Sequence, residues 1–369
     1  MGIKTEPVRR DKRTCLYERH VALGATMVSF GGFDMPLLYQ YAGIAPEHMA
    51  VREHAGLFDV SHMGEVTVKG PDAERYVQHI FTNDIAHAPV GKIYYGKMCY
   101  ENGGTVDDLL VYKMAENDFF LVINAANIDK DWAWMQQNAK GFDIDLQNRS
   151  DYYGQIALQG PEAEHIMETV LNLPCSELAF YTVKTIGDVI VSRTGYTGED
   201  GFEVYASHEY IQQCWDKLID AGVQACGLGC RDTLRFEVGL PLYGDELSED
   251  ITPIMAGLGM FVKLDKEEFI GKDALARQKA EGPARKLVGI ELLDRAIPRH
   301  GYPVLNMEGE PIGEVTTGYH GISVDKSVCM ALVDAQYAAL GTDVQIQIRK
   351  KVFPGKVVKK QFYSKNYKK

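Results

Sequence analysis

The same alternation of apolar and polar positions occurs twice along the chain. Segments 64–69 (GEVTVK) and 154–159 (GQIALQ) alternate like half-buried strands, and each leads through a Gly-Pro break into an amphipathic helical pattern. The second copy begins 90 residues after the first. Each copy then passes through a hairpin-like region to a later strand, at 119–124 and 201–206, and a second helix. The pattern predicts two similar β-α-β-β-α units.

This duplication is typical of an α+β protein with antiparallel sheets. A charged stretch at 266–285 is predicted to be helical, and short strand patterns then recur to the C-terminus, which indicates a small antiparallel barrel. We therefore predict a three-lobed, cloverleaf-like α+β fold with two ferredoxin-like units and a C-terminal β-barrel. A cleft between the two pseudo-symmetric halves is a favoured place for a ligand. The expected domains are 1–148, 149–285 and 286–369, with residues 1–53 assigned either to the first lobe or to packing against the second.

Composition and charge exclude several classes of protein. The chain has 369 residues, 46% of them hydrophobic and 24% charged, which suits a globular protein of two or three domains. A net charge of −12 argues against nucleic-acid binding, and no apolar run is long enough to span a membrane. The first 13 residues carry no secretory or transit pattern, so a cytoplasmic location is expected.

Cysteines and the basic C-terminus add two smaller expectations. The seven cysteines are scattered and odd in number, and the pair Cys226 and Cys230 has no second pair or histidine nearby. Neither a disulfide framework nor a metal site is predicted. The segment 349–369 has nine Lys or Arg and no acidic residue, so it is a candidate docking strip for an acidic partner; a solvated terminal strand is the alternative.

The segment 193–203, RTGYTGEDGFE, contains three glycines within seven residues. Such spacing suits a turn whose backbone takes positive φ or approaches a ligand closely. A strand follows, in which Glu203 and Tyr205 share one face while Phe202 and Val204 point into packing. Glu203 is therefore a candidate ligand contact, although the residues alone leave an ordinary solvated hairpin carboxylate as an open alternative.

A second acidic strand lies in the first repeat, at 103–112 (GGTVDDLLVY). A Gly-Gly turn leads into a strand that begins with Asp107 and Asp108. Alternation places Asp107 and Leu109 on one face and Asp108 and Leu110 on the other, so only one carboxylate can face a given cavity. The pattern does not distinguish a functional acid from solvated turn acids.

In their order along the chain, these segments and several others resemble the T-protein of the glycine cleavage system, a tetrahydrofolate-dependent aminomethyltransferase. The resemblance covers almost the whole chain. Besides the two acidic segments, it rests on residues 30–36, 57–63, 158–162, 230–237, 242–245 and 268–272.

The resemblance implies roles for individual residues. Asp108 matches the catalytic carboxylate of the family, and Glu203 matches the carboxylate that grips the pterin ring of tetrahydrofolate. A carboxylate suits that ring because its 2-aminopyrimidinone edge offers two parallel N–H donors. Tyr196 matches a residue that packs on the pterin, and Arg231 matches a fixed charge beside it. The other positions that the resemblance assigns to the ligand site are Met63, Tyr95, Val122, Asn124, Tyr367 and Arg299.

The implied reaction moves an aminomethyl group from the lipoyl arm of H-protein to tetrahydrofolate, giving methylenetetrahydrofolate, ammonia and dihydrolipoyl H-protein. H-protein is the implied partner, and no metal is expected. For Asp108 we expect orientation of folate N10 and charge stabilisation, with proton acceptance secondary, because an unperturbed Asp has a pKa of about 3.9. Asp108→Asn is expected to keep folate binding and lose most turnover, whereas Asp107→Asn, on the opposite face, is expected to be mild by comparison.

Two relatives within the same superfamily are the alternatives. A folate-dependent demethylase would share Glu203 and the fold but use a different methyl donor. A non-enzymatic folate-binding protein of iron–sulfur cluster maintenance carries a Lys-Gly-Cys-Tyr-x-Gly-Gln-Glu motif, and this chain reads EEFIGK at 267–272, without the cysteine.

Overall fold

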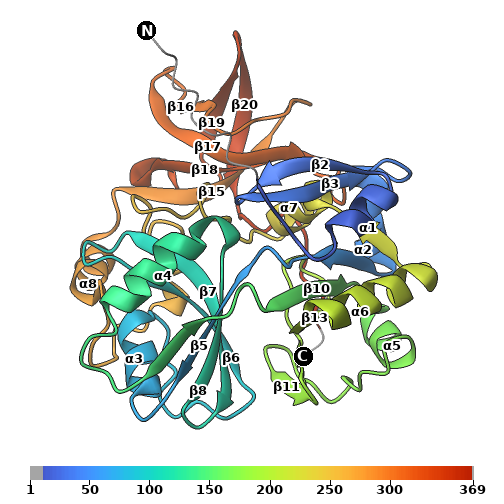
Figure 1. Ribbon diagram of the computed structural model, residues 1–369. Coiled ribbons are helices and arrows are strands. Elements are labelled where there is room, and N and C mark those ends of the chain that lie inside the picture. The colour runs from blue at the N-terminus through green and yellow to red at the C-terminus, as the bar shows by residue number, and fades with distance from the viewer. Residues whose placement is uncertain (1–10, 368–369) are drawn as a thin grey trace, which may run out of the picture.

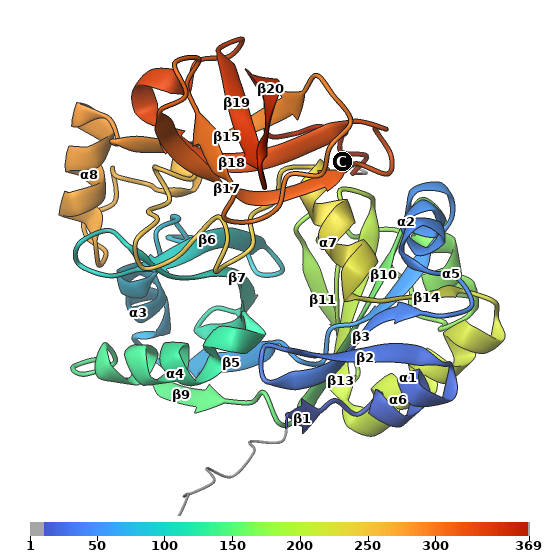
Figure 2. The same ribbon diagram turned by 90° about the horizontal axis from the view of Figure 1, so that it is seen from above.

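The computed structural model describes residues 11–367, so residues 1–10, on which most of the expectation about a leader falls, lie outside the described part. Two sheet-and-helix units and a barrel form three lobes arranged around a common centre (Figures 1 and 2). Within residues 11–367, none of the helices has both the length and the apolar character that a membrane-spanning segment requires. The α+β class with a small antiparallel barrel is confirmed.

The first repeat forms a five-stranded antiparallel sheet with strand order β6-β7-β8-β5-β9. Two helices cover one face of this sheet, and the cluster beneath them contains Tyr76 and Met135 from the helices and Leu109 and Val111 from a strand. The elements are β5 (Gly64–Lys69), α3 (Ala73–Ile80), β6 (Ile93–Cys99), β7 (Thr105–Ala115), β8 (Asp118–Ile123), η1 (Ala125–Asn127), α4 (Ile128–Gln137) and β9 (Asp145–Asn148).

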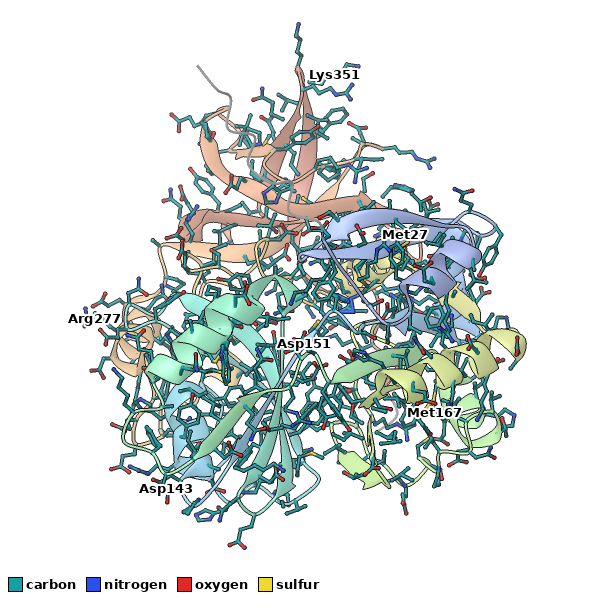
Figure 3. The ribbon with its side chains drawn as sticks, viewed as in Figure 1. Met27, Asp143, Asp151, Met167, Arg277 and Lys351 are labelled. Carbon is teal, nitrogen blue, oxygen red and sulfur yellow. The ribbon has the colours of Figure 1, made fainter. Side chains whose placement is uncertain are left out.

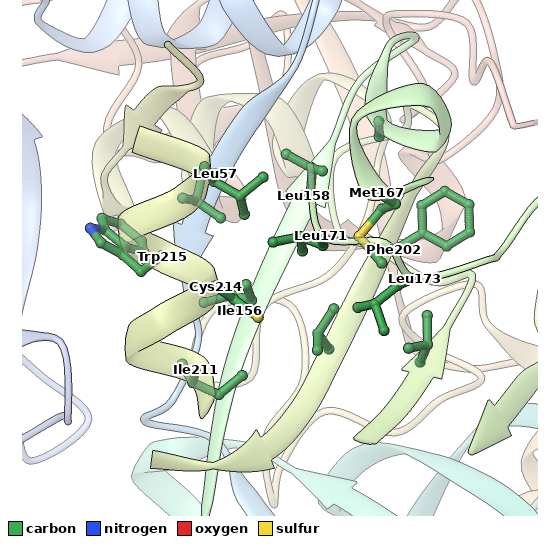
Figure 4. Close-up of a cluster of buried hydrophobic side chains, with 14 of the residues drawn as sticks. Leu57, Ile156, Leu158, Met167, Leu171, Leu173, Phe202, Ile211, Cys214 and Trp215 are labelled. Carbon is green, nitrogen blue, oxygen red and sulfur yellow. The ribbon is translucent and has the colours of Figure 1, made fainter. Parts of the chain in front are cut away.

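The second repeat forms a six-stranded sheet with strand order β11-β12-β13-β10-β4-β14. Its core packs Trp215 of α6 and Phe202 of β13 against Leu158 of β10 and Leu57 of β4 (Figure 4). The elements are β4 (Gly56–Asp59), β10 (Tyr153–Gln159), α5 (Ala163–Thr169), β11 (Val183–Ile186), β12 (Val189–Ser192), β13 (Gly201–Ser207), α6 (His208–Asp220), β14 (Gln224–Cys226) and α7 (Leu228–Glu237).

The N-terminal segment is attached to this second unit. Strand β4 precedes the first repeat in sequence, yet it pairs antiparallel with β10 and parallel with β14. Buried Asp59 accepts hydrogen bonds from Thr14 at 2.6 Å and His20 at 2.9 Å. The remaining elements here are β1 (Lys12–Arg13), α1 (Tyr17–Ala22), β2 (Ala25–Phe30), β3 (Phe33–Tyr39) and α2 (Ile44–Glu53). The domain boundaries given above stay a prediction.

The C-terminal strands close into a six-stranded antiparallel barrel, in the order β15-β18-β17-β16-β19-β20 with β20 returning to β15. The helix expected at 266–285 is shorter, because Gly271 (φ 89°) and Gly282 (φ 85°) bracket α8 in backbone conformations that a helix cannot continue. The elements are η2 (Gly259–Phe261), α8 (Lys272–Glu281), β15 (Arg285–Leu292), β16 (Pro303–Leu305), β17 (Pro311–His320), β18 (Ser327–Asp334), η3 (Ala335–Tyr337), β19 (Asp343–Ile348) and β20 (Lys351–Val358).

The two α+β units meet through the faces of their sheets that the helices leave uncovered. A buried cluster at this junction joins Tyr112 and Val122 of the first sheet to Ile190 and Tyr205 of the second. The hydroxyls of Tyr112 and Tyr205 are 2.7 Å apart. Asp151, in the connection between β9 and β10, lies in the middle of the molecule in Figure 3, where the chain passes from one unit to the other. Several residues of this junction, among them Val122 and Leu110, also line the candidate site.

Candidate functional site

A cavity of about 810 Å³ lies between the two sheets, and we call it the central cavity. Its size is in the range of small-molecule sites. Segment 238–243 lines it, as do Lys359–Gln361 of the segment that follows the barrel. Gly257, Leu258, Met260 and Phe261 also line it. The structure brings together here most of the residues that the sequence assigns to a ligand site, namely Met63, Tyr95, Asp108, Val122, Asn124, Tyr196, Glu203, Arg231 and Tyr367.

Strand β7 presents one of its two neighbouring acids to the central cavity. Leu109, on the Asp107 face, packs in the helix-covered core, whereas Leu110, on the Asp108 face, packs at the junction of the two sheets. Asp108 accordingly lines the cavity and Asp107 does not. Neither acid is a solvated turn residue, since Asp107 is fully buried and Asp108 is largely enclosed.

Asp108 is held by two hydrogen bonds from cavity residues. The Tyr95 hydroxyl donates to Oδ2 at 2.7 Å, and Nδ2 of Asn124 donates to Oδ1 at 2.9 Å. Burial raises the pKa of Asp108 to about 6; the neighbouring Asp107 adds to the increase, while Lys97 and the two hydrogen bonds oppose it. The carboxylate is therefore fixed in direction and titrates just below neutrality.

Asp107 supports the site from behind. Its carboxylate accepts from the backbone N–H of Asn124 at 2.9 Å, from Nδ2 of Asn124 at 2.8 Å and from Nδ2 of Asn127 at 2.7 Å. These bonds fix the turn that follows β8, and with it the amide that reaches Asp108. Loss of a fully buried carboxylate with three donors is expected to destabilise the protein. That substitution of Asp107 lowers turnover less than substitution of Asp108 stays a prediction.

Glu203 enters the central cavity from β13 of the second sheet. Thr194 Oγ1 donates to its Oε2 at 2.5 Å, and Gln155 Nε2 donates to its Oε1 at 3.1 Å. Burial raises the pKa of Glu203, while the bond from Thr194 and the positive charge of Arg231 work against this increase. Phe202 and Val204 pack in the opposite core, as the alternation predicts. Glu203 is thus an enclosed carboxylate rather than a solvated one.

The glycines of segment 193–203 mainly allow close contacts between this turn and neighbouring protein groups. A Cβ at Gly195 would lie 1.8 Å from Oε1 of Gln159, and a Cβ at Gly201 would lie 2.5 Å from Nε2 of the same side chain. Gly198 has φ 84°, which supplies the positive φ that the spacing predicts. Of the three, only Gly195 also lines the central cavity. Gly195 and Gly201 therefore approach buried Gln159, and Gly198 approaches Val238.

Arg231 and Tyr196 form a stacked pair on the cavity wall. The Arg231 guanidinium lies 4.8 Å from the centroid of the Tyr196 ring, and the Tyr196 hydroxyl donates to the Pro241 carbonyl. Burial lowers the pKa of Arg231, while Tyr196 and Glu203 counteract the decrease. Neighbouring Asp232 bonds instead to Arg235, with Nε to Oδ1 at 2.7 Å. Asp232 is paired with Arg235, and Arg231 presents its positive charge to the cavity that it lines.

Two of the expected ligand contacts belong to the C-terminal part of the chain. Tyr367 lines the central cavity and stacks on Phe180 with ring centroids 4.2 Å apart and an interplanar angle of 20°. Arg299 is not among the lining residues; it is exposed and lies 5.5 Å from the centroid of the Tyr319 ring. The structure does not bring Arg299 to the other residues, and its ligand role stays a prediction.

Sequence reasoning missed several polar residues at or behind the cavity wall. His62 lines the cavity, and burial lowers its pKa to about 3, so its ring is neutral. Lys97 is fully buried beside Asp108 on the paired strand, and Gln155 supports Glu203. A lysine within the otherwise uncharged strand 93–99 was the one visible signal for Lys97. His62 and Gln155 carried no such signal.

Two family models match this chain, and together they cover most of its length. A family model described as the GCVT N-terminal domain matches residues 16–266, and one described as the Glycine cleavage T-protein C-terminal barrel domain matches residues 285–364.

Relatives and a solved structure agree over nearly the full length. An aminomethyltransferase from Alkaliphilus oremlandii is 50% identical over 367 residues, covering 97% of this chain and 99% of the relative. One from Lysinibacillus sphaericus is 50% identical over 364 residues, covering 96% and 98%. The crystal structure of glycine cleavage system aminomethyltransferase T from Bartonella henselae superposes with a TM-score of 0.93 at 36% identity, covering 97% and 99%. The likeness therefore includes both α+β units and the barrel.

Proposed function

The chain belongs to the glycine cleavage T-protein family, and from this membership we propose that it transfers an aminomethyl group from lipoylated H-protein to tetrahydrofolate. The chain is an aminomethyltransferase, and the products are 5,10-methylenetetrahydrofolate, ammonia and dihydrolipoyl H-protein. The observation that carries the proposal is the meeting of Asp108 and Glu203, from corresponding faces of the two repeated sheets, in one cavity.

The residues present suit tetrahydrofolate as the acceptor. Glu203 is an enclosed carboxylate that accepts from Thr194, from Gln155 and, at 3.5 Å, from the Tyr205 hydroxyl. Its carboxylate lines the cavity, and a carboxylate is the natural acceptor for the parallel N–H groups of a pterin edge. Tyr196, stacked under Arg231, supplies a flat aromatic surface beside it. When bound, the folate supplies the nitrogen nucleophile that accepts the one-carbon unit. Tyr367 and Phe180 provide a second aromatic surface on the same cavity.

Asp108 supplies charge and orientation. With a pKa of about 6, most of the carboxylate is ionised at neutral pH, and the bonds from Tyr95 and Asn124 hold it in place. A fixed negative charge in an enclosed cavity stabilises positive charge that develops on a reacting amine. The same pKa lets Asp108 accept a proton more readily than an ordinary aspartate. We propose the electrostatic role as the main one.

H-protein is the proposed partner, and the basic C-terminal segment is the candidate docking surface. Lys360 is not free to serve there, because its Nζ donates to the Ala256 carbonyl and burial lowers its pKa to about 8. Lys359 and Lys365 are exposed and also line the central cavity. Charge reversal at Lys359 and Lys365 is expected to raise the KM for H-protein; an unchanged KM would remove this segment from consideration.

A direct assay tests the transfer. Ammonia release is measured from aminomethylated H-protein with and without tetrahydrofolate, together with methylenetetrahydrofolate. Folate-dependent release with equal amounts of the two products supports the proposal. Folate binding without release would favour a demethylase with another donor, or the non-enzymatic iron–sulfur maintenance relatives. A cytoplasmic location remains part of the proposal.

A further inference from the structure

Lys97 is a fully buried lysine directly behind the proposed catalytic carboxylate. It lies on β6, and its Cα is the register partner of Asp108 on β7. Side chains of directly opposed residues in an antiparallel pair stand on the same face of the sheet, about 5 Å apart at Cβ. Lys97 therefore accompanies Asp108 on the face that carries the central cavity, although it is not itself a lining residue.

The Lys97 side chain is held by aromatic rings. Its Nζ lies 3.9 Å from the centroid of the Tyr95 ring and 4.6 Å from that of Phe261. Nζ has no hydrogen-bond partner among residues 11–367. The same Tyr95 donates its hydroxyl to Asp108, so this one residue touches both charged groups. A buried ammonium without an acceptor is costly, and a nearby opposite charge is what offsets that cost.

The titratable groups that face Lys97 come from three parts of the chain. Asp108 faces Lys97 from β7, Cys99 lies two residues along β6, and the ammonium of Lys360 approaches from the C-terminal segment. Around Asp108, the charged neighbours are Asp107 and Lys97, and the phenol groups of Tyr95, Tyr181 and Tyr196 also face it. Asp108 is the acid that acts on Lys97, and Lys97 is the cation that acts on Asp108.

We propose that Lys97 is a positioning residue for the reaction: its ammonium is the counter-charge that keeps Asp108 ionised at neutral pH. Tyr95 and Phe261 hold this ammonium behind the cavity wall, where it acts on the carboxylate without occupying the ligand's space. The inference rests on the proposed role of Asp108 and does not depend on which donor the enzyme uses.

The directions of the two pKa shifts follow from this arrangement. Burial lowers the pKa of Lys97 to about 7, and Asp108 works to raise it. Burial raises the pKa of Asp108 to about 6, and Lys97 works to lower it. Without Lys97, burial and the neighbouring Asp107 act on the carboxyl unopposed by a cation, so a larger share of it is protonated at pH 7.

The test measures the Asp108 carboxyl directly in the folded protein. Infrared carboxyl bands are followed against pH, and the difference from Asp108→Asn assigns the Asp108 signal. In Lys97→Met, the Asp108 pKa is expected to rise by about one unit or more. Lys266→Met is the matched control, because Lys266 is also buried with a lowered pKa, but it is bonded to the carbonyls of Gln78, Phe81 and Asn83. An Asp108 pKa that is unchanged in folded Lys97→Met overturns the proposal.

A reciprocal measurement applies if Lys97→Met does not fold. The Lys97 pKa is followed by lysine ¹³C NMR in the otherwise unaltered protein and in Asp108→Asn. Loss of the carboxylate is expected to lower the Lys97 pKa by about one unit or more, since coupling between two groups is mutual. An equal Lys97 pKa in both proteins overturns the proposal. Both titrations measure the pKa values of Lys97 and Asp108 in the absence of any aminomethyl transfer. Their outcome is therefore separate from that of the transferase assay.

Discussion

Nδ2 of Asn124 donates to Oδ1 of Asp108 at 2.9 Å and also lies 2.8 Å from Oδ1 of Asp107. One amide thus connects the acid in the central cavity with the acid buried behind it. The two aspartates share no face of β7, yet they share this donor. We propose that Asp108 acts in the reaction and that Asp107 holds the structure, and the first prediction tests the second of these roles.

Asp107→Asn is expected to destabilise the protein. The new amide would place an N–H group among the three donors that Asn124 and Asn127 direct at this position. We expect a loss of about 1–3 kcal/mol in the free energy of unfolding, which denaturant titration measures. Turnover falls as well, because Asn124 loses its support. Wild-type stability in this variant would contradict the structural role of Asp107.

The pH profile of the enzyme should have an acidic limb near pH 6. Asp108 must be ionised to act, and its pKa is about 6, so kcat/KM falls as the pH decreases through that value. His62 does not contribute to the limb, because its pKa is about 3 and its ring is neutral on both sides of it. Tyr95→Phe removes a hydrogen bond to the carboxylate and is expected to move the limb to higher pH. A limb at the same pH in this variant would rule out that contribution.

Glu203→Gln is expected to weaken folate binding. The amide keeps one oxygen, but it puts an N–H₂ group opposite the N–H donors of a pterin. A loss of about 2 kcal/mol or more in binding, roughly thirtyfold in Kd, is expected by isothermal titration calorimetry. Glu199→Gln is not a suitable control, because Glu199 is a buried partner of Arg52. Glu209, exposed at the start of α6, is the better matched site.

Glu65 offers a test of stability against pH. It is fully buried on β5, neither carboxyl oxygen has a hydrogen-bond partner within the described residues, and burial raises its pKa well above the usual range. The unfolded chain ionises Glu65 at the ordinary pKa, so folding is penalised as the pH rises above that value, by up to about 1.4 kcal/mol per pH unit. Below the ordinary pKa of a glutamate, Glu65 is protonated in both states and this stability penalty is absent.

Glu65→Leu and Glu65→Gln both remove this titration. Relative to wild type, each variant should therefore gain stability on going from about pH 5 to pH 8, whatever its packing costs at the lower pH. Denaturant midpoints at the two pH values measure the gain. Parallel pH dependence in wild type and both variants would mean that Glu65 is ionised in the folded protein.

Much of the fold followed from periodicity. The duplicated strand–helix order, the face of β7 that carries Asp108 and the face of β13 that carries Glu203 all depend on alternation, which is a local property. The insertion of β4 between β10 and β14 was not predictable in this way. It depends on which sheet buries Leu57, and that is decided by tertiary packing.

The site was predictable where motif residues face the cavity, and less so where residues act from behind it. Lys97 lies opposite Asp108 on the neighbouring strand, and Gln155 donates to Glu203 across a separation of 48 residues. Both contacts depend on the register between paired strands, which the alternation within a single strand does not give. The three glycines of 193–203 indicated a close approach, but only the structure identifies the groups approached, which are Gln159 at Gly195 and Gly201 and Val238 at Gly198. Alternation predicts which face of a strand a side chain lies on, but its contact partners are known only from the assembled sheets.

We propose that Asp108 acts in the transfer and that Glu203 acts in folate binding. The most direct measurement is a single-turnover assay of Asp108→Asn with aminomethylated H-protein, alongside its Kd for tetrahydrofolate. We predict a Kd close to that of the wild type and a loss of folate-dependent ammonia release of about 100-fold or more. Near-normal release by a variant that binds folate normally would contradict the assignment.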